Sequence, residues 1–293
     1  MSDLMPTVLY KFFPEARYDF FDNPKLRFSP LKTLNDPFEG QNSLDAYDTS
    51  YFWGPYTAEE AEIINESIRE KAKEFPIDGL DIDRIAIAVP GGLPPNTYIR
   101  SEDGKCLQSG STYVEEYYEN IGVLSLSGPE KDKEEEFLKK NILIWSHYAE
   151  SHKGFAVGIN PKHQFFDRST QNKWVVGNIA KVSYVEKRPL IRFEDMPKKE
   201  EFFTKLLLTK GNLWEYESEY RLIIDCVKAF NVNNCIGLQE LPVEAITSVY
   251  IGMNATKENE EKVKTFCKQY PFITVYKMHP HRTEYECEMC KLS

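Results

Sequence analysis

A short segment rich in aromatic and acidic residues runs directly into an apolar stretch and constrains this chain more than any other feature. The segment reads Trp-Glu-Tyr-Glu-Ser-Glu-Tyr-Arg over residues 214–221, and Leu-Ile-Ile follows at 222–224. The β-favouring residues predict a buried strand, and side chains two positions apart on a strand point to the same side. We therefore expect Glu217 and Glu219 to face one cleft where a loop enters the strand.

This acidic segment has two interpretations. Three carboxylates within five residues repel one another unless a cation, a hydrogen-bond donor or a ligand compensates them. Arg221 lies next to them in the sequence. In the alternative interpretation the strand is a solvated edge, and a Glu–Arg pair on its surface contributes little stability. The first interpretation predicts a functional site, and the second predicts an ordinary surface.

The hydrophobic pattern of the whole chain indicates an α+β fold. Strands dominate the centre, helices lie between them irregularly, and no sustained strand–helix–strand rhythm is present. We expect a single domain over 1–293 with a mixed, mainly antiparallel sheet and peripheral helices, a mostly helical insertion at 45–120, and a loosely packed tail at 279–293. The expected strands are 7–13, 26–29, 122–128, 155–159, 180–186, 220–226, 246–253 and 272–278, and the expected helices are 57–75, 111–120, 194–210 and 256–269.

Charge and hydropathy narrow the function classes. A formal net charge of −10 argues against a broad electrostatic surface for duplex DNA or for an anionic membrane. The sequence contains no apolar run near the roughly 20 residues that span a bilayer, and its N-terminus does not read as a signal segment. We expect a cytoplasmic protein without a membrane partner.

The cysteines do not form a disulfide pattern, because all six are scattered in a chain that lacks secretion signals. Cys287 and Cys290 follow His279 and His281, and two thiolates with two imidazoles suit tetrahedral zinc. The two histidines are separated by one residue instead of the usual three to five, and ordinary tail residues are the alternative. We therefore include no metal ligand among the site residues.

Two further motifs carry polar and aromatic residues. The sequence Asn35-Asp36-Pro-Phe-Glu39 packs turn-forming residues into one loop, which is either a rigid corner or a loop that clamps a ligand. Trp145-Ser-His147-Tyr148 precedes the predicted strand 155–159 and suits a pocket that stacks a flat ring and hydrogen-bonds its edge. His147 is equally well explained as a histidine with satisfied hydrogen bonds in the core.

These motifs together resemble the DUF2971 family of bacterial proteins of unknown function. The resemblance rests on Leu-Tyr-Lys-Phe at 9–12, the 35–39 loop, the segments 145–148 and 151–155, and the segment 214–221, in that order. It covers roughly residues 8 to 250. The family name implies relatedness and no particular chemistry.

The chain is also similar in outline to enzymes that transfer ADP-ribose from NAD. Those enzymes carry a ring-binding residue on an early strand, a central aromatic that stacks nicotinamide, and a Glu-x-Glu pair entering a late strand. Tyr10-Lys11, His147-Tyr148 and Glu217-Ser-Glu219 would take these places here. The chain lacks the early His or Arg of those enzymes and their Ser-Thr-Ser type motif.

This second resemblance implies a mechanism. Glu219 would stabilise the oxocarbenium-like cation that forms when nicotinamide leaves, and Glu217 would orient or deprotonate the acceptor. Arg221 or Lys11 would pair with the pyrophosphate. We expect the remaining cofactor-binding residues to share one cleft with these groups: Tyr10, Asn35, Asp36, His147 and Tyr148.

The function expected from this resemblance is that of an NAD-dependent ADP-ribosyltransferase-like enzyme of the toxin or phage-defence kind. Its acceptor would be a nucleic acid or a protein, and an antitoxin or another regulatory partner would control it. The alternative is a non-catalytic module of a bacterial defence or stress system that binds a nucleotide or a protein through the same cleft. Release of nicotinamide from NAD separates the two.

Overall fold

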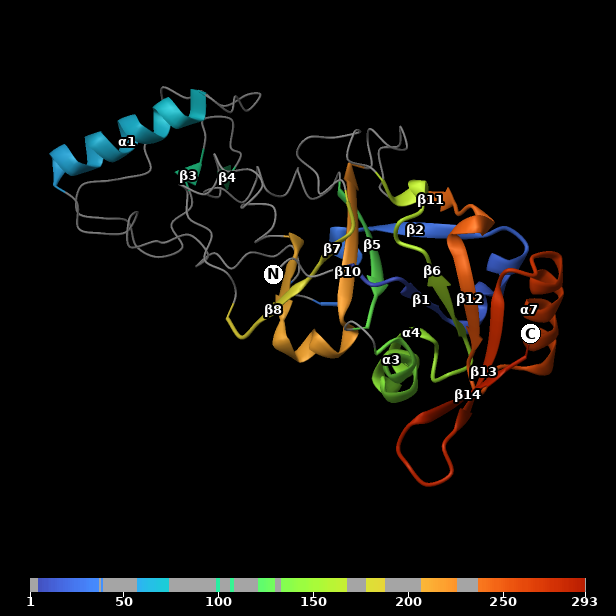
Figure 1. Ribbon diagram of the computed structural model, residues 1–293. Helices are drawn as coiled ribbons and strands as arrows, with labels where there is room; N and C mark the ends of the chain where they lie inside the picture. The colour runs from blue at the N-terminus through green and yellow to red at the C-terminus, as the bar shows by residue number, and fades with distance from the viewer. Residues whose placement is uncertain are drawn as a thin grey trace.

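The architecture is that of a large mixed sheet with helices on both of its faces, seen in a computed structural model (Figure 1). The structure describes residues 5–36, 38, 57–73, 99–100, 106–107, 121–129, 133–167, 178–187, 207–225 and 237–292. Within these residues, eight strands of the sheet follow the order β11-β2-β5-β1-β6-β12-β13-β14, while β10 pairs with β5 and β7 pairs with β10. The strands are β1 (Leu9–Phe13), β2 (Lys25–Pro30), β5 (Ile121–Ser127), β6 (Phe155–Ile159), β7 (Ala180–Lys181), β10 (Glu219–Asp225), β11 (Gly237–Glu240), β12 (Ile246–Ile251), β13 (Thr274–Pro280) and β14 (Cys287–Lys291).

Nearly all neighbouring strands of this sheet are antiparallel. The exception is β12 with β13, which are parallel and are joined by the helix α7 (Lys257–Gln269). Two small pairs lie outside the sheet: β3 (Ile99–Arg100) with β4 (Cys106–Leu107), and β8 (Ser183–Val185) with β9 (Thr209–Gly211). The expected α+β class with a mixed, mainly antiparallel core is confirmed.

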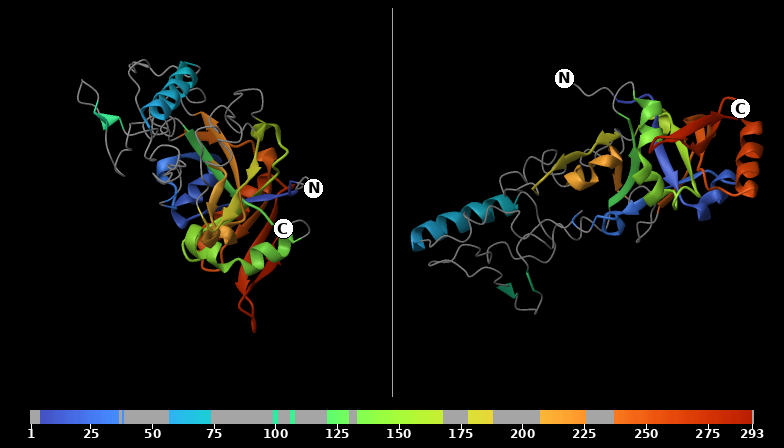
Figure 2. Two further views of the ribbon diagram at one scale, coloured as in Figure 1. Left: turned by 90° about the vertical axis from the view of Figure 1, so that its left-hand side faces the viewer. Right: turned by 90° about the horizontal axis from the view of Figure 1, so that it is seen from below.

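Alternation along the strands gives the sheet two apolar faces. On β6, Phe155 and Val157 enter one core with Phe266 of α7, whereas Ala156 enters the other core with Trp145. The first face is covered by α7 and by the 3-10 helix η1 (Glu15–Phe21), and α7 lies beside β13 in Figures 1 and 2. The second face is covered by α4 (Ile142–Tyr148), which follows α3 (Glu134–Lys140). This second face carries the candidate site.

One edge of β5 is shared by two strands, which leaves a gap between them. β2 pairs with the start of β5 at Val123, and β1 pairs with its end at Ser127. Ser125 lies between these two pairing points. Its carbonyl oxygen accepts a hydrogen bond of 2.8 Å from the Nζ of Lys11. The Lys11 side chain therefore bonds the Ser125 carbonyl in place of a neighbouring strand, and the sheet has a gap between β1 and β2 at this point.

The expected insertion at 45–120 is described only in part. The helix α1 (Ala58–Lys73) begins at a capping box, in which the amide of Glu60 donates to the Thr57 hydroxyl and the Glu60 carboxylate accepts from the Thr57 amide. Figure 1 and the right panel of Figure 2 show α1 apart from the central sheet. The helix expected at 111–120 lies outside the described residues. No helix in the described part of the chain is long and apolar enough to cross a membrane.

Two expectations from the sequence are wrong. The helix expected over 194–210 does not include its last residues, because Thr209–Gly211 form β9 parallel to β8, while 194–206 lie outside the described residues. The tail at 279–293 is not loose where it is described, because β14 pairs with β13 from Cys287 to Lys291. Cys287 is buried there and Met289 packs against the same core cluster, so both side chains dock this strand.

Candidate functional site

The two acidic residues of the 214–221 segment do not lie on one strand. Glu217 is the last residue of the 3-10 helix η8 (Asn212–Glu217), Ser218 adopts a left-handed conformation with φ of 44°, and β10 begins at Glu219. The expectation that both carboxylates project from the same strand is therefore wrong. They nevertheless converge, because the turn at Ser218 brings the end of η8 back over the start of β10.

The two carboxylates meet at Lys210. Its Nζ lies 2.7 Å from Oε2 of Glu217 and 3.4 Å from Oε2 of Glu219, and the three side chains are 2%, 5% and 4% exposed. Lys210 also lies over the ring of Trp214, with Nζ 4.7 Å from the ring centroid. Lys210 is not among the expected site residues, because the sequence pattern placed it at the end of the helix expected over 194–210. The signal was indirect: two buried acids require more positive charge than Arg221 alone supplies.

Glu219 is fully engaged by the protein. Nε and one terminal nitrogen of Arg221 each donate to a different Glu219 oxygen at 2.8 Å, and the other terminal nitrogen donates to the Leu207 carbonyl at 2.7 Å. Burial alone would raise the pKa of Glu219, but Arg221, Lys210 and the Ser125 hydroxyl lower it to about 2. The expected alternative of a solvated surface pair is wrong, because both side chains are buried.

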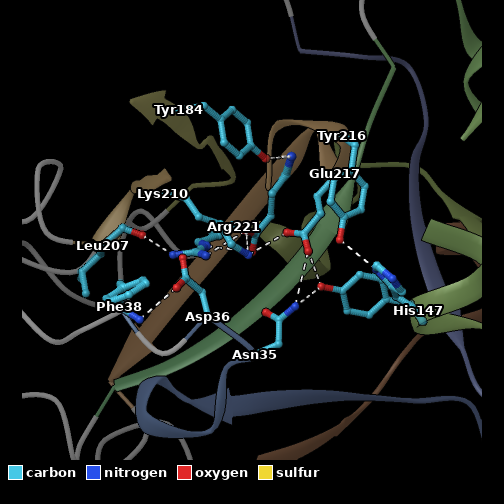
Figure 3. Close-up of polar contacts among 12 residues, drawn as sticks. Asn35, Asp36, Phe38, His147, Tyr184, Leu207, Lys210, Tyr216, Glu217 and Arg221 are labelled. Atoms are coloured by element: carbon cyan, nitrogen blue, oxygen red, sulfur yellow. Dashed lines mark hydrogen bonds and ion pairs between the residues drawn. The ribbon is translucent and has the colours of Figure 1, made fainter. Parts of the chain in front are cut away.

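Glu217 presents its second oxygen to two polar side chains. The Tyr148 hydroxyl donates to Oε1, and Nδ2 of Asn35 lies 3.5 Å from the same atom (Figure 3). Asn35 also donates to the Tyr148 oxygen. Burial and the negative charge of Glu217 raise the pKa of Tyr148, so the phenol stays protonated and acts as a donor. Three segments distant in the sequence meet at this carboxylate.

A cleft of about 220 Å³ opens beside these groups, between β1, β2 and β5. Glu217, Glu219 and Lys210 form one end, together with Tyr148 and Asn35. Lys11 lies toward the gap in the sheet. The other lining residues come mainly from the three strands and from the turn after β2: Tyr10, Phe12, Ser29, Thr33, Leu34, Val123, Ser125 and Ser127. The structure thus brings six of the nine expected site residues to one cleft: Tyr10, Lys11, Asn35, Tyr148, Glu217 and Glu219.

The other three expected residues do not line the cleft. Asp36 is buried, and its Oδ1 accepts a hydrogen bond of 2.9 Å from the amide of Phe38, as in the rigid-corner interpretation of this loop. Arg221 is held by Glu219 and by the Leu207 carbonyl, and Figure 3 shows the contact with Leu207. His147 is exposed, with Nδ1 2.9 Å from the hydroxyl oxygen of Tyr216. Burial, and then Glu217, raise the pKa of Tyr216 to about 12.

The indole and the second histidine of the 145–155 motif serve the fold. Trp145 is fully buried, its Nε1 donates to the Leu138 carbonyl at 3.0 Å, and its ring packs edge-on against Phe12. His152 stacks on the indole with ring centroids 5.9 Å apart, and burial lowers the pKa of this histidine. The expectation that Trp145 stacks the flat ring of a ligand is therefore wrong, because Phe12 and His152 already pack against the indole ring.

The same motif contains a left-handed turn, and the glycine that follows it passes close to β1. Glu150, Ser151 and His152 have φ values of 49°, 52° and 65°, which reverse the chain after α4. At Gly154 an added Cβ would lie 1.9 Å from the carbonyl oxygen of Phe13. The chain can pass this close to β1 only with glycine at that position.

Lys11 differs from the other site cations in having no carboxylate partner. Within the described part of the chain its Nζ makes one hydrogen bond, to the Ser125 carbonyl, and no ion pair within 4.0 Å. Burial lowers its pKa to about 8. Glu219 opposes this shift, while Arg17 and Arg27 add to it. An ammonium group with so few partners favours either deprotonation or an anionic ligand.

The cysteine and histidine residues near the C-terminus lie on a strand ladder. Cys287 pairs opposite Pro280 and is buried, whereas Cys290 pairs opposite Lys277 and is exposed. The Nδ1 atom of His281 accepts hydrogen bonds from two backbone amides. Among the residues that the structure describes, no group of three or more His, Cys, Asp or Glu side chains is placed to hold a metal ion.

Comparison with known proteins gives one match. Residues 144–222 match the model of a family described as a protein of unknown function, DUF2971, which confirms the resemblance over that part of the chain. The matched segment contains most of α4, all of β6, Lys210 and both carboxylates of the cleft, but neither β1 nor Asn35. No curated protein and no solved structure gave a significant match.

Proposed function

We propose that the cleft binds the nicotinamide–ribose end of NAD and that the protein is an ADP-ribosyltransferase-like enzyme. The observation that carries the proposal is the state of Glu217. Lys210 holds one of its oxygens at 2.7 Å, and the other oxygen meets Tyr148 and Asn35 at the cleft wall. A carboxylate that is paired with a cation, oriented by two further donors and adjacent to a ligand space is suited to stabilise positive charge that develops on a sugar.

The size of the cleft fits part of the dinucleotide. Sites for drug-sized ligands usually measure roughly 300–1,000 Å³. A cleft of about 220 Å³ therefore suits one end of NAD, with the remainder of the molecule outside it. The mixed, mainly antiparallel core agrees with a sheet of the ADP-ribosyltransferase kind, and we include that finer fold assignment in the proposal.

In this proposal Glu217 acts directly and Glu219 acts as a positioning residue. Both Glu219 oxygens are held by the Arg221 guanidinium, which leaves that carboxylate little freedom to meet a ligand. Glu219 instead fixes Lys210, which in turn fixes Glu217. The charge-stabilising role that the sequence resemblance implied for Glu219 thus passes to Glu217 in this proposal, and Glu217 keeps its role toward the acceptor.

The reaction balances with these groups. The bond between C1′ of the ribose and the nicotinamide nitrogen breaks, and its electron pair leaves with nicotinamide, which becomes neutral. Glu217 stabilises the positive charge left on the ribose. A nucleophilic oxygen or nitrogen of the acceptor then bonds to C1′, and its proton passes to the Glu217 carboxylate. We propose a nucleic acid or a protein as acceptor, in a toxin or phage-defence setting with a regulatory partner.

Nicotinamide release from labelled NAD tests this function, in reactions with and without nucleic acid or protein acceptors. Glu217→Gln should lower turnover by on the order of a hundredfold, equivalent to ~2.7 kcal/mol, while NAD affinity measured by calorimetry changes little. Glu215→Gln is the matched control, because Glu215 lies in the same 3-10 helix, is exposed and does not line the cleft. Equal turnover in Glu217→Gln and wild type would remove Glu217 from the mechanism.

A non-catalytic nucleotide-binding module is the second candidate function. It is favoured by the observation that all four carboxylate oxygens of Glu217 and Glu219 already have protein partners. Such a site would bind NAD without cleaving it. NAD binding with no nicotinamide release under any acceptor condition would select this function over the first.

A further inference from the structure

Lys11, which is partly buried, stands out among the lysines of the described chain that are withdrawn from solvent. Lys210 is paired with two carboxylates, and the Nζ of Lys277 lies 3.5 Å from Glu260 and 2.9 Å from the Gly252 carbonyl oxygen. The ammonium group of Lys11 has one carbonyl partner and lines the cleft. A desolvated charge without a counter-ion is costly, so a counter-ion supplied by a ligand would stabilise this arrangement.

The surroundings of Lys11 supply further donors for an anion. Ser29 of β2 and Ser127 of β5 line the same cleft, and neither side-chain hydroxyl has a hydrogen-bond partner among the described residues. Arg17 and Arg27 do not line the cleft, but their charges add to the positive potential at Lys11. Lysine, arginine and hydroxyl side chains are the groups that commonly contact phosphate oxygens.

We propose that the gap between β1 and β2 is a phosphate subsite, in which Lys11 holds one phosphate group of a nucleotide together with the hydroxyl at one edge of the gap, Ser29 or Ser127. The identity of the nucleotide as NAD rests on the proposed function, but the phosphate does not. Glu217 and Lys11 both line this cleft, so a ligand that fills it can contact both side chains. Arg221 is not available for a phosphate, because Glu219 and the Leu207 carbonyl occupy its donors.

The protonation of Lys11 gives the subsite a distinctive property. The charged groups that act on this ammonium are Glu219 and Glu217, which favour its protonation, and Arg17 and Arg27, which oppose it. Its pKa of about 8 leaves a fraction of the amine neutral near pH 8. A bound phosphate favours the charged form, so binding at pH 8 should take up protons. A lysine with a merely structural role would show no such uptake.

The experiment compares AMP with adenosine by titration calorimetry on the full chain at pH 8, in two buffers of different ionisation enthalpy. AMP should bind the wild type at least roughly tenfold more tightly than adenosine, with proton uptake. Lys11→Met should remove both the preference and the uptake, and a Ser29→Ala, Ser127→Ala double variant should reduce the preference. Lys153→Met is the control, because Lys153 is exposed and does not line the cleft.

The outcomes separate this inference from the proposed function. Equal affinity of the wild type for AMP and adenosine overturns the subsite, even if nicotinamide is released from NAD. A folded Lys11→Met that keeps the preference overturns it too. If Lys11→Met does not fold, the wild type decides: proton uptake on binding AMP supports the subsite, and binding of AMP without proton uptake overturns it. A phosphate preference that depends on Lys11 in a protein that never releases nicotinamide supports the subsite and ends the enzymatic proposal.

Discussion

Replacing Glu219 with glutamine removes one charge from the buried ion pair that anchors the site. The near-isosteric amide keeps the shape of the side chain but leaves the Arg221 guanidinium, which is 1% exposed, without its counter-ion. The two hydrogen bonds of 2.8 Å between these residues are both charge-assisted. Removing one partner of a buried pair costs roughly 3–5 kcal/mol, because the other charge stays buried and uncompensated.

The pKa of Glu219 gives an independent magnitude. It falls from 4.5 to about 2, although burial opposes the shift, because Arg221 and Lys210 stabilise the ionised form. One pKa unit corresponds to about 1.4 kcal/mol, so the surroundings of Glu219 as a whole favour its ionised form by about 3 kcal/mol at neutral pH, relative to the unfolded chain. The folded pKa lies below the unfolded one. The contribution is therefore complete above pH 4.5 and is lost as the pH falls through about 2.

Urea unfolding followed by tryptophan fluorescence measures this cost. At pH 7 the free energy of unfolding of Glu219→Gln should fall by about 3 kcal/mol. The difference from the wild type should be smaller at pH 3, where part of the wild-type stabilisation is already lost. The control is Glu261→Gln, since Glu261 is exposed and pairs with Lys264 at 3.0 Å; it should cost at most ~1 kcal/mol.

Two results would refute this reasoning. One is a loss at pH 7 no greater than that of Glu261→Gln, which would mean that Arg221 finds water or another partner at no cost. The other is a loss that does not depend on pH between 3 and 7, which would separate the instability from the charge of Glu219. A double variant, Glu219→Gln with Arg221→Met, should lose less than the sum of the single variants, because no charge of the pair remains buried alone.

Two further predictions concern the walls of the site. Gly154→Ala should destabilise the fold by about 1–3 kcal/mol in the same urea assay, because the Cβ of the alanine would lie 1.9 Å from the Phe13 carbonyl oxygen. A variant as stable as the wild type would show that β1 can move to make room. Tyr148→Phe should lower nicotinamide release at least roughly tenfold, since Glu217 loses a donor that orients it, whereas Tyr216→Phe should lower it less because its hydroxyl contacts the exposed His147. Equal release by both variants would count against a role for Tyr148.

Local signals in the sequence were enough for most of the scaffold. The strand expected at 155–159 coincides with β6, because five apolar and β-favouring residues lie between turns. The helix α7 begins after Thr256, whose hydroxyl accepts from the Asn259 amide, as its capping pattern indicates. Such elements depend on contacts within a few residues, so their type is readable without the fold.

The motifs pointed to the cleft, but they did not reveal which of its side chains form ion pairs and hydrogen bonds with one another. Glu217 and Glu219 were recognised as a pair, yet their convergence comes from the left-handed Ser218 and not from strand periodicity. Lys210 belongs to no motif, and its strand forms only because β8 is there to pair with it. A residue whose role depends on a neighbouring element carries little local signal.

The sequence by itself determined the strand and helix types, the caps and the residues that carry charge, because these follow from periodicity and short-range hydrogen bonds. Only the tertiary structure decided which charges are paired. Asn35 meets Glu217 across 182 positions, and Lys11 meets the Ser125 carbonyl across 114. Burial then sets the energy of each contact, since a carboxylate with two cations stays ionised while a lysine with only a carbonyl partner has a lowered pKa. Neither burial nor pairing is a property of a short stretch of sequence.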